Sequence, residues 1–128
     1  MKLRVTKSTI RMRLSQTDIQ QFIDNGSVEE TLSIGPSPSG SLTYRLVRGH
    51  EQQSVSVSFE NKRLTVWLPG PEADLWSGSD EVGIEAVQAG TDGTEVQILV
   101  EKDFACLTPR PGDDDVDSFP HPKSAKDC

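Results

Sequence analysis

The chain repeats its own apolar pattern at a fixed interval. When the 128-residue sequence is shifted by 54 residues without gaps, two pseudo-repeats align, residues 2–48 and 54–102. Few residues are identical, but apolar positions fall on apolar positions, and these are the ones that a shared fold must keep. The matched pairs are Leu3 with Val57, Val5 with Phe59, Ile10 with Leu64, Met12 with Val66, Leu14 with Leu68, Phe22 with Trp76, Val28 with Val82, Leu42 with Val96, Tyr44 with Ile98 and Leu46 with Val100.

Each pseudo-repeat is predicted to fold as ββαββ. Apolar and polar residues alternate in the strands, as in half-buried strands. The segment SQTDIQQFIDNG carries capping residues, an apolar stripe and a terminal glycine, and PGPEADLWSGS is a shorter version of it, so each predicts a helix. The predicted strands are 2–6, 10–15, 28–34 and 42–47 in the first copy, and 55–59, 64–68, 82–87 and 96–101 in the second.

The fold class that follows is mainly β (α+β), with eight strands and two short helices. One unit alone buries a single sheet face and is marginally stable, whereas two units can bury their faces against each other. We therefore expect a closed or nearly closed β-barrel or a sandwich, with the helices plugging its ends. The alternative is two four-stranded α+β layers side by side. We expect residues 1–102 to form a single β-rich domain and residues 103–128 to form an acidic, proline-rich tail packing on it.

Charge and cysteine content narrow the class of protein. A net charge of −7 argues against nucleic-acid binding and against anionic membranes. No stretch approaches the ~20 apolar residues of a membrane helix, and the first residues contain no signal peptide. Two cysteines are too few for a disulfide framework. We expect a cytoplasmic protein; the alternative is a longer precursor whose signal has been removed.

The tail has no counterpart in the first copy, yet it contains large apolar residues. By the alternation, Trp67 points outward, as do Val87 and Leu99. We expect Phe104, Leu107 and Phe119 to cover this apolar patch, since burying one such side chain contributes ~1.5–3 kcal/mol. The alternative is a solvated, charged tail.

The tail also carries a resemblance. The segment VEKDFACLTPRPGDDDVDSFPHP resembles the C-terminal signature of a small bacterial family of uncharacterised proteins of this length, which is similar along the whole chain, including RLS and VEET near the front. The resemblance implies a bacterial protein and no particular chemistry.

Soft metal ligands occur in the same tail. Cys106, His121 and Cys128 can supply sulfur and nitrogen to zinc, with one aspartate as the fourth ligand. The candidates for that position are Asp113, Asp114, Asp115 and Asp117. The spacing lacks a paired C-x-x-C, and the alternative is a buried Cys106 with an exposed His121. The DDDVD run lacks the EF-hand pattern of a calcium site.

Catalysis is not favoured by any motif. Cys106 as a nucleophile requires a nearby base, and His50 and His121 are the only histidines. There is no G-x-S-x-G, no glycine-rich phosphate loop and no H-E-x-x-H. We expect no catalytic residues.

Two groups of polar residues are candidate binding surfaces. Glu30 and Tyr44 share the inward face with apolar neighbours and can line a pocket at the barrel mouth; the repeat partner of Glu30 is Ile84. Alternatively, the head of Glu30 lies in water at a strand end. A second group, of basic residues, projects from the first hairpin. It can attract an anionic partner, or bind the acidic tail of this chain or of a second copy. Alternatively, its charges keep the edge strand in solvent and prevent it from pairing with another chain. Its members are Lys2, Arg4, Arg11 and Arg13.

We expect a non-enzymatic cytosolic domain that binds a protein or a small ligand. Its working surface is predicted to combine Trp67, Phe104, Phe119, Arg4, Arg11, Arg13, Glu30 and Tyr44. The alternative function is zinc-dependent and uses the tail cysteines and His121. No other cofactor is expected, and a homodimer is one arrangement compatible with the sequence.

Overall fold

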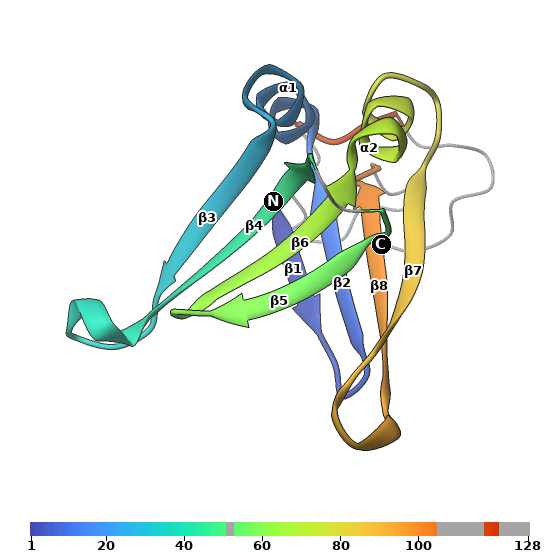
Figure 1. Ribbon diagram of the computed structural model, residues 1–128. Coiled ribbons are helices and arrows are strands. Elements are labelled where there is room, and N and C mark those ends of the chain that lie inside the picture. Colours follow the sequence, from blue (N-terminus) through green and yellow to red (C-terminus); the bar gives the residue numbers. More distant parts are fainter. Residues whose placement is uncertain (51–52, 105–116, 121–128) are drawn as a thin grey trace.

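The computed structural model describes residues 1–50, 53–104 and 117–120. In this part of the chain eight strands form two four-stranded sheets, and two α-helices lie together at one end of them (Figure 1). The strands are β1 (Lys2–Val5), β2 (Thr9–Leu14), β3 (Ser27–Ser33), β4 (Ser41–Gly49), β5 (Ser56–Glu60), β6 (Arg63–Pro69), β7 (Gly83–Ala89) and β8 (Glu95–Lys102). The helices are α1 (Gln16–Asn25) and α2 (Gly70–Ser77), and the short 3₁₀ turns are η1 (Pro38–Gly40) and η2 (Thr91–Gly93).

Each sheet combines hairpins from both halves of the chain. The strand orders are β1-β2-β8-β7 and β3-β4-β6-β5, with a parallel pair, β2–β8 or β4–β6, in the middle of each sheet. The prediction of eight strands and two helices in a sandwich is confirmed. A closed barrel is wrong, because no strand pairing among the described residues joins the two sheets. The alternative of two layers side by side, one from each half of the chain, is also wrong. Each sheet has a central parallel pair that joins a strand of the first half to a strand of the second.

The registers of the two sheets agree with the 54-residue shift. Met12 lies opposite Val100 in one sheet, and the shifted residues Val66 and Leu46 lie opposite each other in the second sheet. The third strands of the two halves, β3 and β7, do not follow this shift, because the pairing positions in β7 lie two residues later than the shift predicts. Only Gly26 separates α1 from β3, whereas residues 78–82 separate the shorter α2 from β7.

The two-residue offset changes one predicted equivalence. Glu30 pairs with Tyr44 in β4, and the residue that pairs with Ile98 at the corresponding place in β8 is Ala86. The structural counterpart of Glu30 is therefore Ala86 and not Ile84, as the ungapped alignment predicted. That the halves arose by duplication remains our interpretation of the sequence.

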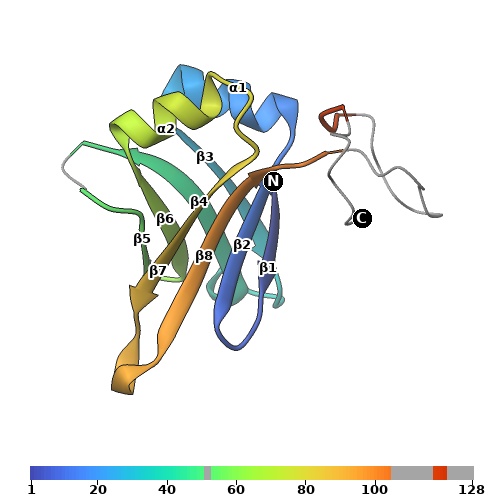
Figure 2. The same ribbon diagram turned by 90° about the vertical axis from the view of Figure 1, so that its right-hand side faces the viewer.

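The helices are formed by local signals and held by packing. Ser15 and Asp18 make a capping box at the start of α1, and Gly26 ends it with a left-handed backbone at φ 76°. Both helices lie over the same end of the sandwich (Figure 2), where the rings of Phe22 and Trp76 meet edge to face at 6.2 Å. The expectation of one helix at each end is wrong, because β2 and β6 lead to the same end.

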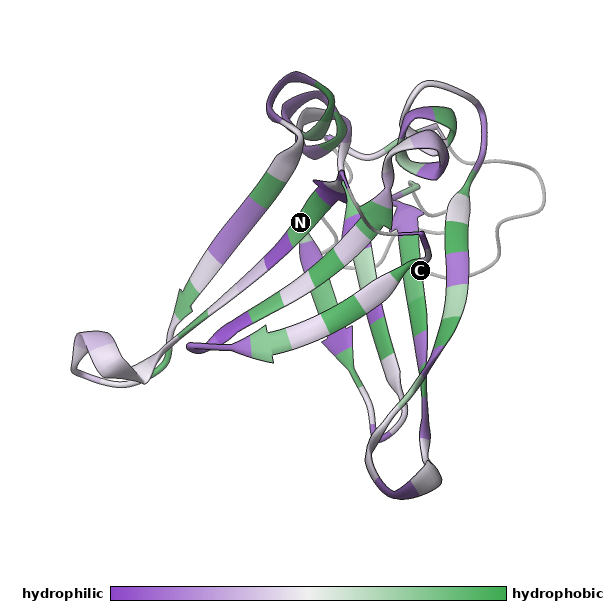
Figure 3. Ribbon diagram, in the orientation of Figure 1, coloured by the Kyte–Doolittle hydropathy of each residue, from purple (hydrophilic) through white to green (hydrophobic). Residues whose placement is uncertain are grey.

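The core lies between the sheets and beneath the helices. Apolar residues alternate with polar ones along the strands (Figure 3), and the inward ones are buried. Neither helix of the described part is long and apolar enough to cross a membrane. The buried apolar residues are Met12, Leu14, Ile19, Phe22, Val28, Leu46, Val55, Val66, Leu68, Ala73, Trp76, Ile98 and Val100.

The end of the sandwich away from the helices is open. Val5, Leu32 and Phe59 belong to the inward-facing series of their strands, since each pairs with the inward series of its neighbour. They are nevertheless 53–63% exposed, because the sheets diverge here and no helix covers them (Figure 1). Alternation specifies which face of a strand a side chain lies on, and at this end of the molecule the inward face is not buried.

Side chains bridge the two long seams between the sheets. Between β5 and β7, the amide of Gln88 accepts from the Val57 N–H at 2.7 Å and donates to the Val57 carbonyl at 2.9 Å. Between β1 and β3, the amino group of Met1 lies 2.7 Å from Glu30. A side-chain amide and the Met1 amino group thus connect edge strands that are not paired through their backbones.

Candidate functional site

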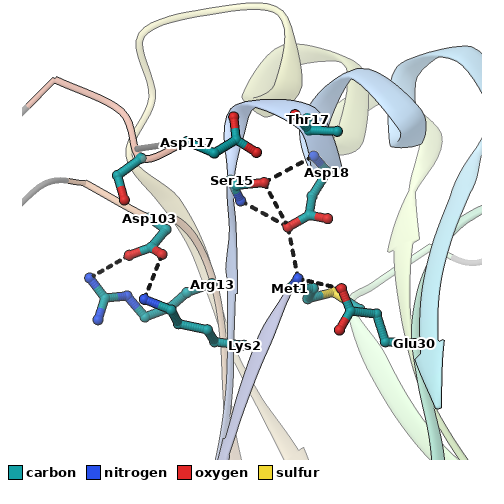
Figure 4. Close-up of a pocket in the computed structure, with 10 residues that line it drawn as sticks. Met1, Lys2, Arg13, Ser15, Thr17, Asp18, Glu30, Asp103 and Asp117 are labelled. Carbon is teal, nitrogen blue, oxygen red and sulfur yellow. Dashed lines mark hydrogen bonds and ion pairs between the residues drawn. The ribbon is translucent and has the colours of Figure 1, made fainter. Parts of the chain in front are cut away.

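A pocket of about 310 Å³ lies where β1, the first turn of α1 and the tail meet (Figure 4). It combines charged groups from segments far apart in the sequence. The lining residues are Met1, Lys2, Arg13, Ser15, Thr17, Asp18, Glu30, Asp103, Asp117 and Ser118.

One side of the pocket is organised around the buried carboxylate of Asp103. Because β8 runs parallel to β2, Asp103 emerges beside the end of β2, where its N–H donates to the Leu14 carbonyl at 2.8 Å. Its two carboxylate oxygens lie 2.9 Å from Lys2 Nζ and 3.0 Å from Arg13 Nη2. The Nε of Arg13 is buried and has no hydrogen-bond partner among the described residues. Two cations share one carboxylate, so this side is positive.

The opposite side is organised around the Met1 amino group. It lies 2.9 Å from Asp18 Oδ2 and 2.7 Å from Glu30 Oε1. The Asp18 carboxylate also accepts from the Ser15 N–H and hydroxyl at 3.0 Å. Burial on its own lowers the pKa of the amino group, but the hydrogen bonds to Glu30 and Asp18 outweigh burial and raise it. Two carboxylates share one cation, so this side is negative.

Tyr44 is hydrogen-bonded to two groups of the negative side. Its hydroxyl lies 3.2 Å from both Glu30 Oε2 and the Met1 carbonyl oxygen. Burial raises the pKa of Tyr44, and the charge of Glu30 raises it further. Glu30 and Tyr44 therefore contact each other, and Glu30, but not Tyr44, is among the residues that line the pocket.

Asp117 brings the tail to the pocket. The hydroxyl groups of Thr17 and Ser15 hold the pKa of its exposed carboxyl below the usual value. Its carbonyl oxygen accepts from the Gln16 N–H at 3.1 Å, and the Gln16 side chain donates to the Ser118 carbonyl at 3.0 Å. Residues 117 and 118 are thus tied to the first turn of α1.

The two tail phenylalanines pack beside the pocket and not on the outer sheet face. The Phe119 N–H donates to the Asp103 carbonyl at 2.7 Å, and its ring lies 5.7 Å from that of Phe104 and 5.8 Å from Lys102 Nζ. Phe119 also packs against the core. Leu107, the third residue expected in this contact, lies outside the described residues.

Trp67 lies apart from this region. It projects from β6 on the outer face of its sheet, where its Nε1 donates to Ser58 at 3.2 Å and Arg45 lies 5.8 Å from its ring. Val87 and Leu99 belong to the other sheet. The three residues therefore do not form one patch, and Trp67 does not share a surface with the tail phenylalanines.

The basic hairpin is divided between the pocket and the open sheet face. Lys2 and Arg13 take part in the pocket, and Arg11 pairs with Glu101 in the adjacent strand. Arg4 is exposed opposite Arg11, and it has no ion pair within the part of the chain that the structure describes.

The proposed zinc ligands Cys106, His121 and Cys128 lie outside the described residues, as do Asp113, Asp114 and Asp115. Among the residues that are described, no three metal-ligating side chains come together. His50 is exposed directly after β4.

Sequence reasoning identified Arg13 and Glu30 but missed Asp103, the carboxylate partner of Arg13, and Asp18, which shares the Met1 amino group with Glu30. Asp18 was recognised only as a helix-terminus residue, and Asp103 was assigned to the tail. The available signal was the position of Asp103 directly after β8, but this signal becomes informative only once β8 is known to lie beside β2.

The fold and the pocket define a two-sheet β-sandwich protein with paired helices at one end and a charged pocket beside them. The chain belongs to a family of unknown function (DUF7009), whose family model matches residues 1–123. The resemblance to an uncharacterised family is thereby confirmed, while its bacterial origin remains a prediction. Neither a curated protein nor a solved structure matches the chain.

Proposed function

We propose that this protein is a non-enzymatic binding domain that takes up a small zwitterion in the charged pocket. The observation that carries the proposal is the separation of charge across the pocket, with Lys2 and Arg13 around Asp103 on one side and Asp18 and Glu30 around the Met1 amino group on the other (Figure 4). A ligand with an anionic and a cationic group matches both sides at once.

The positive side supports binding of a carboxylate or another small anionic group. Lys2 and Arg13 carry two positive charges against the single carboxylate of Asp103. The guanidinium of Arg13 makes its one ion pair through Nη2, and its Nε has no partner among the described residues. The buried Nε is out of reach of a ligand, but a guanidinium has five donors, so the terminal N–H groups of Arg13 retain capacity for a second anion.

The negative side supports binding of an ammonium group. Asp18 and Glu30 together offer two negative charges to the Met1 amino group. The hydroxyl groups of Thr17 and Ser15 lower the pKa of Asp117, and this carboxylate has no ion pair among the described residues. A ligand cation can therefore pair with the Asp117 carboxylate in the pocket lining.

The pocket volume limits the size of the ligand. Small-molecule sites usually measure about 300–1,000 Å³, so a pocket of about 310 Å³ is at the small end of the range. A free amino acid or a molecule of similar size fits this limit better than a nucleotide or a peptide.

The test compares zwitterions with singly charged analogues. Free α-amino acids, their amides and their N-acetyl derivatives are titrated into ¹⁵N-labelled protein, and amide shifts at residues 15–18 and 103 are followed by NMR. We expect the free amino acids to bind at least about tenfold more tightly than either analogue, which corresponds to ~1.4 kcal/mol. Equal affinity for the three classes, or no shift with any of them, would refute the proposal.

Matched variants locate the binding. Arg13→Gln is expected to reduce the preference for the carboxylate, and Asp117→Asn the preference for the ammonium. Arg63→Gln and Asp92→Asn make the same changes at exposed positions outside the pocket and are expected to leave binding unchanged. A melting curve of each variant separates loss of binding from loss of folding.

The alternative function is zinc-dependent and uses Cys106, His121 and Cys128. Native mass spectrometry combined with elemental analysis tests it on the full chain. Stoichiometric zinc that is lost in Cys106→Ala supports this alternative, and a metal-free protein contradicts it. The same spectrum reports whether the protein is a monomer or a homodimer. Cytoplasmic location is part of our proposal and is tested by fractionation of the source cells.

A further inference from the structure

The open end of the sandwich exposes large apolar side chains that belong to the inner faces of the two sheets. Val5 lies on β1, Leu32 on β3 and Phe59 on β5, and Ile34 directly follows β3. These four side chains, which we call the open-end cluster, are 53–70% exposed, and neither α1 nor α2 covers them (Figure 1). None of them lines the charged pocket.

The open-end cluster continues the core along the strands. Three of its members pair across their hairpins with apolar residues that are half-buried. Single apolar residues scattered over a surface are common, but a set that extends the core row by row is not. The pairs are Val5 with Ile10, Leu32 with Leu42 and Phe59 with Leu64.

The exposed apolar area is comparable to what a dimer interface needs. At 53–70% exposure, the four side chains together present roughly 400 Å² of apolar surface, which is in the range of patches that are often functional. A standard interface buries about 800 Å² on each partner, and somewhat more than half of this area is apolar. The open-end cluster therefore supplies most of the apolar area that one side of such an interface requires.

The hairpin ends around the cluster carry no net charge, although the protein carries −7. These ends are residues 5–10, 32–42, 59–64 and 88–96, and they lie away from the helices (Figure 1). The negative charge of the protein therefore belongs to the rest of the chain, and two copies can approach through this end with the least repulsion. The charged residues of the four ends are three bases, Lys7, Lys62 and Arg63, and three acids, Glu60, Asp92 and Glu95.

We propose that the open end is a self-association surface, on which a second copy of the chain packs about a twofold axis. In such a contact the same side chains of both copies meet, so that the two open-end clusters leave water together. A second copy offers both a matching apolar area and hairpin ends without net charge. Basic and acidic residues of these ends can pair across the rim of the interface.

Sedimentation velocity of the full chain tests the proposal between about 1 and 200 μM, at low and at high salt. We expect a monomer at the lowest concentration and a dimer at the highest. Salt should strengthen the dimer, because it screens the repulsion between two copies that each carry −7. A monomer at every concentration would overturn the proposal, and so would a dimer that high salt dissociates. Unfolding measured at about 1 μM reports on the monomer, whose open end is in water.

Matched variants locate the interface. Phe59→Ser is expected to weaken the dimer at least about tenfold, because large aromatic residues contribute most at the centre of an interface. Leu32→Ser should weaken it at least about fivefold, whereas Leu75→Ser, at a similarly exposed leucine of α2, should leave it unchanged. Equal weakening by the two leucine variants would show that the dimer uses another surface.

A second matched pair preserves the β-branched shape of the side chain. Val5→Thr is expected to weaken the dimer about threefold, but Val87→Thr is not, since Val87 is equally exposed on the outer face of β7. Melting curves recorded at about 1 μM check that each variant folds. Dimerisation that responds to Val87→Thr and not to Val5→Thr would contradict the proposal.

Two further measurements separate this surface from other ligands. Arg13→Gln in the charged pocket is expected to leave dimerisation unchanged, so the outcome of the zwitterion test does not affect this one. Sodium octanoate is titrated into the ¹⁵N-labelled full chain. If the protein stays monomeric and octanoate shifts the amides of residues 5, 32 and 59, a small apolar molecule is the occupant and the dimer proposal is wrong.

Discussion

At the residue scale, Asp103 has the largest role in the charged pocket. It is buried, its carboxylate holds Lys2 and Arg13, and its backbone connects β2 with the Phe119 N–H. A buried carboxylate is costly unless it is paired, and here it has two cations. Asp103 therefore links pocket geometry to stability.

Replacing Asp103 with alanine is expected to destabilise the protein by about 1–3 kcal/mol, because Arg13 loses its ion pair in a largely buried place. The measurement is urea unfolding followed by circular dichroism. Glu29→Ala removes an exposed carboxylate in β3 and should change stability by no more than about 0.5 kcal/mol. If the two variants are equally stable, the pairing of Asp103 has no net stabilising effect.

At the scale of elements, local signals form each helix but do not place it. The capping box of Ser15 and Asp18 begins α1, and Gly26 ends it. α2 has no side-chain cap and begins after Pro69, so its stability depends more on the packing of Trp76 beneath it. Phe22 and Trp76 join the two helices above the core.

Because Ser15 caps α1 at the edge of the pocket, Ser15→Ala is expected to cost about 1 kcal/mol. The Asp18 N–H loses its acceptor, and the Asp18 carboxylate loses the Ser15 hydroxyl as a donor. Thermal unfolding is the measurement, and Ser54→Ala, at an exposed serine with no side-chain hydrogen bond among the described residues, is the control. A Ser15 variant as stable as the control would show that the cap does not contribute.

At the scale of the whole molecule, the sandwich is closed at one end and open at the other. The helices cover the inner faces at one end, where Trp76 is fully buried. At the other end the sheets diverge, and Phe59 is 63% exposed although it faces inward. Equivalent positions in the alternation therefore differ in environment.

This asymmetry predicts unequal costs for two aromatic truncations. Trp76→Ala should cost about 3–5 kcal/mol, as expected for a large core residue, whereas Phe59→Ala should cost less than about 1 kcal/mol because most of its surface is already in water. Chemical denaturation measures both. If Trp76→Ala does not fold, Trp76→Phe gives a smaller change for comparison. A large cost for Phe59→Ala would show that the open end is covered in solution.

The sequence by itself determined the local structure. Alternation over segments such as Ile10 to Leu14 identified the eight strands, and Ser15, Asp18 and Gly26 identified α1, because these signals depend on neighbours within a few residues. The 54-residue shift also agreed with the register of the central parallel pairs.

Only the tertiary structure decided which hairpins share a sheet, which end the helices cover and which charges meet. The alternation of β2 is equally compatible with β8 and with a strand of its own half, because period-2 patterns specify a face and not a neighbour. Pairing of β2 with β8 places Asp103 beside Arg13, and the tail then adds Asp117 above Ser15. The pocket joins residues as far apart in the sequence as Lys2 and Asp103, and such contacts arise from the packing of the complete chain.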